Sequence, residues 1–221
     1  MNARQLQEWL NAHGQAVIVD GVCGPQTRTA ISAAFASDCA PAITEDDISI
    51  LAARLGCTVK QIKAVAKVES GGRAYDDLGR PKMLFERHKF YQLTGGAHGV
   101  TPFSNPKSGG YNEDSWFKLT RAACLDVDAA FASASWGRFQ VLGMHWKSLK
   151  YPSPLEMAYS AVTGEAAHYE MLARYIEHFG LEQAIGQLST NPKDNELFAR
   201  LYNGPAFKRF SYDTKLAEAM R

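Results

Sequence analysis

The sequence predicts a mainly α-helical protein built from two parts of unequal size. Apolar residues recur at i, i+3 and i+4 near the start of the chain, at Leu6, Trp9 and Leu10, and this helical spacing returns from Leu155 onward. Between the two, the stretch SDCAPAITEDD interrupts the pattern with a proline and a cluster of polar residues. We therefore place a domain boundary near Ala40, which gives a small domain over 1–40 and a large one over 41–221.

The small domain is expected to contain two helices. The first covers Leu6 to Leu10 and ends at His13-Gly14, because glycine readily adopts the backbone conformation that ends a helix. The second begins at Pro25, since proline suits the first turn, and continues through Ile31 and Phe35.

The large domain is expected to open with two more helices. Thr44 and Asp47 have the spacing of a capping box, and Thr58 with Gln61 repeats it. Residues 74–111 are rich in Gly, Pro, Asn and Asp, so they predict loops with a small β-hairpin. The last segment, 207–221, is amphipathic and is expected to dock on the core.

Composition excludes several classes of protein. Lys and Arg number 24 against 23 Asp and Glu, a net charge of +1, so no field of one sign favours nucleic acid. No apolar run approaches the ~20 residues of a membrane span, and the N-terminus lacks the apolar core of a signal peptide, so we expect a cytoplasmic protein without stable membrane insertion. The four cysteines are scattered, which favours free thiols over disulfides or a zinc site.

One carboxylate stands out on an apolar helical face. Ile62, Val65 and Ala66 line one side of the helix that starts at Thr58, and the same period arrives at Glu69. Burial raises the pKa of a carboxyl group, which suits a general acid. Position alone favours a structural role instead, in which Glu69 points to solvent or pairs with Lys67, Arg73 or Arg80. The Ser70-Gly71-Gly72 break that follows would open a cleft beside the acid.

The small domain resembles the peptidoglycan-binding domain found at one end of many cell-wall hydrolases. The matching residues are Asp20, Gly21, Gly24, Pro25 and Thr27, between two apolar helices. The resemblance implies a ligand from the bacterial wall, with Asp20, Thr27 and Arg28 as candidate contacts.

Three short elements in the large domain form an ordered set. Glu69-Ser70 is followed after roughly 65 residues by Ser135-x-Gly137-x-x-Gln140, and after a similar interval by Tyr202-Asn203. This order resembles the soluble lytic transglycosylase and goose-type branches of the lysozyme superfamily. The run from Val68 to Gly96, with ASWGRFQVLG and LYNG, is similar to the N-acetylmuramidase domain of modular phage endolysins.

This resemblance implies a lysozyme-like fold and cleavage of the β-1,4 bond between N-acetylmuramic acid and N-acetylglucosamine in peptidoglycan, for host cell lysis. It makes Glu69 the catalytic acid. Glycoside hydrolysis usually needs a second group, for which Glu86 is our first candidate and Asp76 or Asp77 the next, while assistance by the substrate's acetamido group stays open. Tyr202 and Asn203 are expected to bond the acid or that acetamido group, and Ser135, Trp136 and Gln140 to line the glycan groove.

Other functions remain as alternatives. A lytic transglycosylase would cleave the same bond and leave a 1,6-anhydro ring, and a decayed catalytic domain would only bind the wall. The Glu165-x-x-His168 spacing is found in di-iron bundles, but the second copy and further glutamates are missing, so we expect no metal and no cofactor, and take His168 as a helix-surface or core residue. We expect a monomer that, as the resemblance implies, waits in the host cytoplasm for holin-dependent release to the wall.

Overall fold

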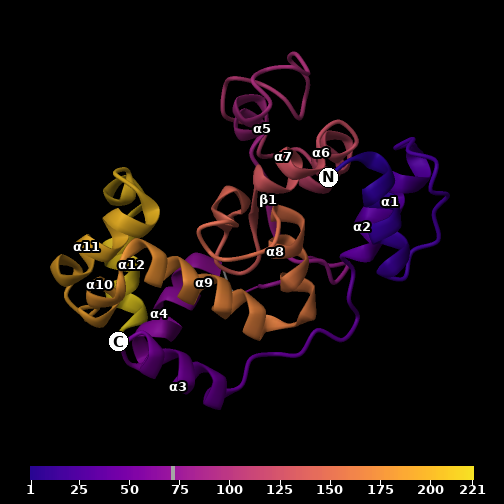
Figure 1. Cartoon of the computed structure of the whole chain (residues 1–221). Helices are drawn as coiled ribbons and strands as arrows, with labels where there is room; N and C mark the ends of the chain where they lie inside the picture. Colours follow the sequence, from indigo (N-terminus) through magenta and orange to yellow (C-terminus); the bar gives the residue numbers. More distant parts are fainter. Residues whose placement is uncertain (71–72) are drawn as a thin grey trace.

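The computed structural model describes residues 1–70 and 73–221, and it is rich in α-helix with one small sheet. Figure 1 shows α1 and α2 at one side of the molecule, beside α6 and α7, and α10 to α12 at the opposite side. Helix α9 runs across the space between them. The helices of the first half are α1 (Ala3–Ala12), α2 (Pro25–Ala34), α3 (Glu45–Arg54), α4 (Val59–Ser70) and α5 (Arg87–Leu93); those of the second half are α6 (Ser115–Ala123), α7 (Val127–Ala132), α8 (Pro154–Ser160), α9 (Glu165–Phe179), α10 (Glu182–Gly186), α11 (Pro192–Asn203) and α12 (Tyr212–Ala219).

The helix starts expected from capping boxes are confirmed. The Thr44 side chain accepts from the backbone of Asp47, whose carboxylate accepts in turn from Thr44 at the start of α3. Thr58 and Gln61 make the same reciprocal pair ahead of α4. Two donors that a helix start otherwise leaves unpaired are satisfied at each site, so both helices begin where the sequence fixes them.

The segment 74–111 contains the expected loops and a small hairpin, in which Tyr75 forms an antiparallel bridge with Pro81. A second hairpin lies later in the chain, where β2 (Ala134–Trp136) pairs with β3 (Val141–Leu142). The segment also contains helix α5 and strand β1 (Met83–Phe85), and β1 pairs with the distant strand β2. Periodicity within 74–111 could not reveal this, because the partner of β1 lies some fifty residues away in the sequence.

The core of the large domain holds a cluster of aromatic rings, and one of them comes from the small domain. Trp136 stacks on Phe131 with ring centroids 5.7 Å apart and meets Trp116 edge to face. Phe35, at the end of α2, stacks on both Phe131 and Trp136 and is fully buried. The small domain is therefore part of the hydrophobic core of the large one.

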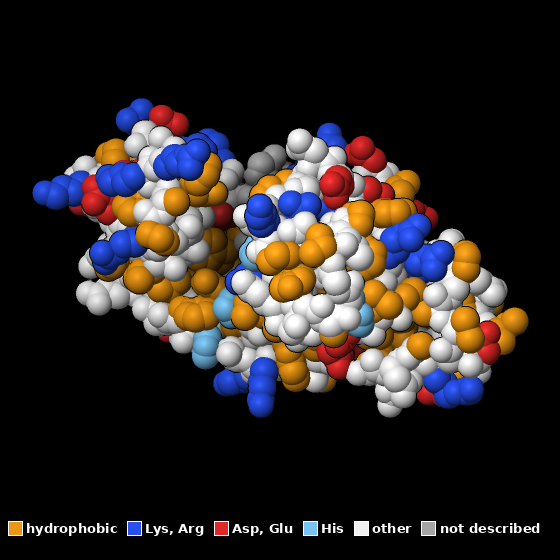
Figure 2. Space-filling model, turned by 90° about the horizontal axis from the view of Figure 1, so that it is seen from above, with side chains coloured by type: hydrophobic (Ala, Val, Ile, Leu, Met, Phe, Trp, Pro, Cys, Tyr) orange, Lys and Arg blue, Asp and Glu red, His pale blue; other side chains and the backbone are white. Residues whose placement is uncertain are grey.

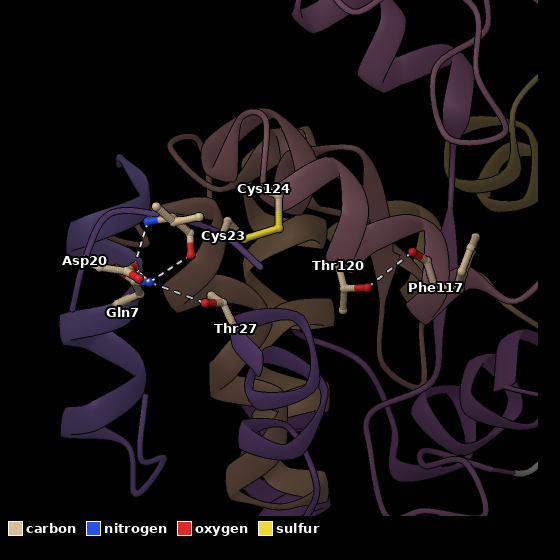
Figure 3. Close-up of a disulfide and its surroundings, with 8 residues drawn as sticks. Gln7, Asp20, Cys23, Thr27, Phe117, Thr120 and Cys124 are labelled. Atoms are coloured by element: carbon tan, nitrogen blue, oxygen red, sulfur yellow. Dashed lines mark hydrogen bonds between the residues drawn. A yellow bond between two sulfur atoms is a disulfide. The ribbon is translucent and has the colours of Figure 1, made fainter. Parts of the chain in front are cut away.

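A disulfide joins the two regions, contrary to the expectation of free thiols. Cys23, just before α2, is bonded to Cys124 at the end of α6, 101 residues away (Figure 3). Spacing along the chain says nothing about pairing in space, and this pair has no sequence signature of its own. Cys39 and Cys57 are free, and burial raises the pKa of the Cys57 thiol to about 11.

The C-terminal segment docks as expected. Leu216 on α12 is fully buried, and α12 packs against α4 and α11. Within residues 1–70 and 73–221, no helix is both long and apolar enough to cross a membrane.

Candidate active site

Glu69 lies in the last turn of α4, where the buried face of that helix ends. Ile62, Val65 and Ala66 on that face are buried, and Glu69 itself is partly buried. Because α12 packs beside α4 and Asn203 of α11 bonds to Glu69, the carboxylate faces neighbouring helices instead of open water. Gly71 and Gly72, which were expected to form the edge of a cleft, lie outside the described residues.

The partner of Glu69 is an amide from the other end of the chain. Asn203 Nδ2 donates a hydrogen bond to Glu69 Oε1 at 2.9 Å. Asn203 is the last residue of α11, and Gly204 ends the helix with a φ of 82°, a conformation that favours glycine. The Asn203 Oδ1 atom is buried and has no partner among the described residues.

Burial sets the acidity of Glu69. Desolvation raises its pKa to about 7, while the hydrogen bond from Asn203 and the charge of Lys215 on α12 act in the opposite direction. A carboxyl group with this pKa is partly protonated at neutral pH, which is the form needed to donate a proton to a leaving oxygen.

Tyr202 connects α11 to the second sequence element. Its hydroxyl donates to the backbone oxygen of Phe139 at 3.1 Å, and its ring stacks on Phe198. Burial raises the Tyr202 pKa well above its usual value, so the phenol stays protonated. The described bond of Tyr202 is thus to the backbone of the Ser135–Gln140 element, and the bond to Glu69 comes from Asn203.

The Ser135–Gln140 element forms the β2–β3 turn. Gly137 and Gln140 both have positive φ, 69° and 50°, and Gln140 Nε2 donates to the Gly137 oxygen at 2.8 Å. Ser135 is partly buried in the strand, opposite Leu142. Trp136 is fully buried and its Nε1 donates to the Phe131 oxygen. The prediction that it lines the glycan groove is therefore wrong, and Trp136 is a core residue.

His168 and Glu165 on α9 both contact Arg138 in this turn. The Arg138 N–H donates to His168 Nδ1 at 2.8 Å, and His168 Nε2 lies 2.9 Å from the Ala161 oxygen, so the ring is neutral with its proton on Nε2. Glu165 Oε1 pairs with the Arg138 guanidinium at 2.7 Å. A side chain at Gly137 would collide with the His168 ring, so this position requires glycine. His168 is therefore a core residue with its polar atoms satisfied, and burial lowers its pKa to about 4.

We expect two substitutions at position 168 to separate turn positioning from general stability. In His168→Asn the side-chain oxygen can replace Nδ1 as the acceptor for Arg138, whereas in His168→Gln the amide can replace only the Nε2 donor. Each variant should lose about 1–3 kcal/mol of stability. Only His168→Gln should also lose about tenfold in kcat for the peptidoglycan cleavage that the resemblance implies, because it frees the turn. Thermal unfolding and turbidity kinetics measure the two effects, and equal kcat in both variants would contradict a positioning role.

The other acidic candidates have partners of their own. Glu86 precedes α5, where its Oε2 accepts from the Tyr111 hydroxyl at 3.1 Å and lies 3.2 Å from His88 Nδ1. Asp76 accepts from the backbone and guanidinium of Arg80. Asp77 is almost fully exposed and pairs with Arg73. Among the described contacts, none brings these carboxylates to Glu69.

Two of the three candidate residues in the small domain are part of its own framework. Asp20 accepts from Gln7 Nε2 at 2.8 Å and from the Val22 N–H, and the bond from Gln7 lowers the Asp20 pKa (Figure 3). Thr27 is buried beside the same Gln7 amide. Arg28, by contrast, has no ion pair among the described residues and lies at the surface of α2.

Fold and site together define a lysozyme-like protein whose candidate acid, Glu69, lies in the last turn of α4. Residues 58–221 match the N-acetylmuramidase family model, and the chain belongs to that family. Residues 2–63 match a predicted peptidoglycan domain. The whole chain is similar to the crystal structure of the Burkholderia AP3 phage endolysin, at 29% identity and a TM-score of 0.74, over 99% of this chain and 92% of that one. No curated protein matches. These findings identify a modular endolysin that degrades peptidoglycan.

The sequence missed the role of α9. The spacing of Glu165 and His168 was considered as a metal-binding pattern. In the structure both side chains instead accept hydrogen bonds from Arg138. The i, i+3 spacing correctly places both side chains on one helical face, but it carries no information about which distant group that face meets.

Proposed function

We propose that the protein hydrolyses the β-1,4 bond between N-acetylmuramic acid and N-acetylglucosamine in peptidoglycan, with Glu69 as general acid. The observation that carries this proposal is the pKa of Glu69, about 7, in a carboxyl group bonded to Asn203. Membership of the N-acetylmuramidase family supports the same bond as the substrate.

The contacts of Glu69 assign separate tasks to its two oxygens. Among the described contacts, Asn203 Nδ2 holds Oε1, and we propose that Oε2 carries the proton. In the proposed reaction that proton passes to the glycosidic oxygen as its bond to the anomeric carbon of N-acetylmuramic acid breaks. Water then adds to the anomeric carbon and returns a proton to the Glu69 carboxylate, so the enzyme is regenerated.

We propose that the second group of the mechanism is the acetamido group of the substrate and not the Glu86 carboxylate. The Glu86 carboxylate accepts a hydrogen bond from Tyr111 and lies beside His88. Glu86 itself lies between β1 and α5. Asn203 bonds the acid directly, which supports the transglycosylase-like arrangement in which the acetamido group of the bound sugar assists a single carboxyl group. We therefore propose Glu69 as the single essential carboxylate.

The substrate is proposed to lie in the recess between the C-terminal helices and the rest of the molecule. Figure 2 shows the surface hollowed between these two parts. Asn203 on α11 and Lys215 on α12 approach Glu69 from one side, and the β2–β3 turn is tied to α11 by Tyr202. Gln140 in that turn remains a proposed glycan contact.

We propose host cell lysis as the biological role. The protein would act as a monomer on the wall after holin-dependent release from the host cytoplasm. The Cys23–Cys124 disulfide supports action in an oxidising compartment such as the periplasm, where such bonds persist.

Mass spectrometry of the released muropeptides tests the reaction. Hydrolysis is expected to give N-acetylmuramic acid with a free reducing end. A lytic transglycosylase would give the 1,6-anhydro product, lighter by one water, and that product would overturn the proposal. Absence of any soluble muropeptide at every pH tested would leave only wall binding.

A further inference from the structure

Helix α11 carries apolar side chains that the core of the protein does not use. The helix packs against α12 and buries Asn195, Phe198 and Ala199. On its other face, Leu197 and Leu201 lie one turn apart and are 38% and 47% exposed. Packing within the chain therefore does not explain this second apolar stripe.

Two cations extend the same outer face of α11. Lys193 lies one turn before Leu197, and Arg200 lies three residues after it, so both share its side of the helix. Both side chains are exposed, and neither has an ion pair among the described contacts. Asp194 beside them is already occupied, because Ser189 Oγ donates to its carboxylate at 2.7 Å. The outer face of α11 thus combines exposed leucines with free positive charge.

The 3-10 helix η3 (Phe207–Phe210) adds an aromatic ring and a further cation. Phe207 is buried, whereas Phe210 is 54% exposed. The guanidinium carbon of Arg209 lies 5.8 Å from the centroid of the Phe210 ring. In the part of the chain that the structure describes, Arg209 has no ion pair. The end of η3 therefore presents an apolar ring and a free cation together.

Lys208 fixes η3 beside α11. Its Nζ pairs with Glu196 of α11 at 2.6 Å and with Asp213 of α12 at 2.7 Å. Because Glu196 lies one turn before Arg200, the contact places η3 next to the outer face of α11. Both carboxylates are thereby paired inside the protein. Figure 2 shows Lys, Arg and hydrophobic side chains gathered on the part of the molecule that the C-terminal helices form.

These side chains form one surface, which we call the α11–η3 surface: Lys193, Leu197, Arg200, Leu201, Arg209 and Phe210. Apolar side chains flanked by free cations are typical of proteins that bind at the interface of an anionic bilayer. The apolar groups enter the boundary beneath the headgroups, and the cations meet the phosphates. Arginine suits this contact, since its guanidinium can donate two parallel hydrogen bonds to a phosphate.

We propose that the α11–η3 surface binds acidic phospholipid at the surface of a bilayer. A soluble polyanion would need the cations alone and would leave the exposed leucines and Phe210 without a role. Leu216 of α12 is fully buried, so the contact is made by the outer face of α11 and by η3, and not by the apolar face of the terminal helix. The binding is peripheral, and it does not depend on the proposed hydrolysis.

Co-sedimentation of the full chain with lipid vesicles tests the proposal. Vesicles of phosphatidylglycerol and phosphatidylethanolamine are compared with vesicles of phosphatidylcholine, and the acidic vesicles should bind wild type at least about tenfold more tightly. Arg200→Gln/Arg209→Gln should lose about tenfold or more in affinity for the acidic vesicles. Leu201→Ser/Phe210→Ser should lose about tenfold as well, because it removes the apolar contact. Added salt should weaken the binding of wild type, since exposed charges are screened.

Two matched controls make the same changes at exposed side chains elsewhere. Lys107→Gln/Lys147→Gln removes two positive charges, and Ile50→Ser/Val100→Ser removes two apolar side chains that are 69% and 68% exposed. Both controls should bind acidic vesicles like wild type, and thermal unfolding confirms that each variant is folded.

Three results would overturn the proposal. The first is equal binding of wild type to acidic and neutral vesicles, and the second is equal binding of the arginine variant and the lysine control. The third is a loss in the arginine variant while Leu201→Ser/Phe210→Ser binds like wild type, which would identify a general affinity for polyanions. Because the vesicles contain no peptidoglycan, a failure of the proposed hydrolysis would not imitate any of these results.

Discussion

Glu69→Gln is expected to lower the rate of peptidoglycan hydrolysis by about 10³-fold while the protein stays folded and bound to the wall. General acid catalysis typically contributes 10²–10⁴-fold, and an amide cannot supply the proton. The fold should persist because a glutamine oxygen can still accept from Asn203 Nδ2. Turbidity loss of peptidoglycan measures the rate, and a sedimentation assay measures wall binding. Activity within tenfold of wild type would remove Glu69 from the mechanism.

Glu86→Gln is the comparison that assigns the second group. Its carboxylate contacts Tyr111 and His88, so the variant should keep most of the hydrolysis rate and lose some stability. A loss as large as that of Glu69→Gln would restore Glu86 as a catalytic residue.

The pH dependence of stability, compared between wild type and Glu69→Gln, tests the raised pKa of Glu69 without relying on rates alone. The folded pKa of Glu69, about 7, lies above its unfolded value of about 4.3. Burial of Glu69 therefore costs stability progressively as pH rises from about 4 to 7. Glu69→Gln should match wild type in thermal unfolding at pH 4 and unfold at a higher temperature at pH 8. Wild-type hydrolysis should decline as pH rises through about 7, and an identical difference in Tm at both pH values would contradict the raised pKa.

Loss of the Cys23–Cys124 bond is expected to have the largest effect on stability. The bond closes a loop of 101 residues, for which the chain-entropy account gives about 4 kcal/mol or more. Cys23→Ser/Cys124→Ser should then lower Tm by roughly 10 °C, since 1 kcal/mol corresponds to a few degrees in a protein of this size. Differential scanning calorimetry measures the shift.

Two controls separate the bond from other effects of thiol chemistry. Reduction of the wild-type protein should reproduce the double serine variant, and Cys39→Ser, which removes an exposed free thiol, should unfold like wild type. The small domain should remain docked in the reduced protein, because Phe35 stays in the aromatic core and Trp9 still donates to Glu156. No change in Tm on reduction would show that the bond does not constrain the unfolded chain.

The sequence predicted best what depends on local spacing. The capping boxes of α3 and α4 and the position of Glu69 on the apolar face of α4 follow from residues within a few turns of one another. Resemblance added the link from Glu69 to Asn203, which periodicity has no means of finding across 134 residues.

What could not be predicted depends on contacts between distant residues. Trp136 lies within a matching motif, yet its burial is decided by Phe35, Phe131 and Trp116 from other parts of the chain. The pairing of Cys23 with Cys124, and the contact of His168 with Arg138, likewise depend on how α2, α6 and α9 meet. The proposed boundary near Ala40 remains a prediction, and the two family matches overlap at residues 58–63.

The place of Phe35 limits how freely such a protein can exchange its parts. Recombination that replaces the first forty residues would remove a ring that the large domain needs for its own packing, and an unfilled space of that size costs about 3–5 kcal/mol. A new wall-binding module would have to bring an aromatic residue to the position of Phe35. Modules that bind other walls can therefore be exchanged only if they also supply this ring to the core of the large domain.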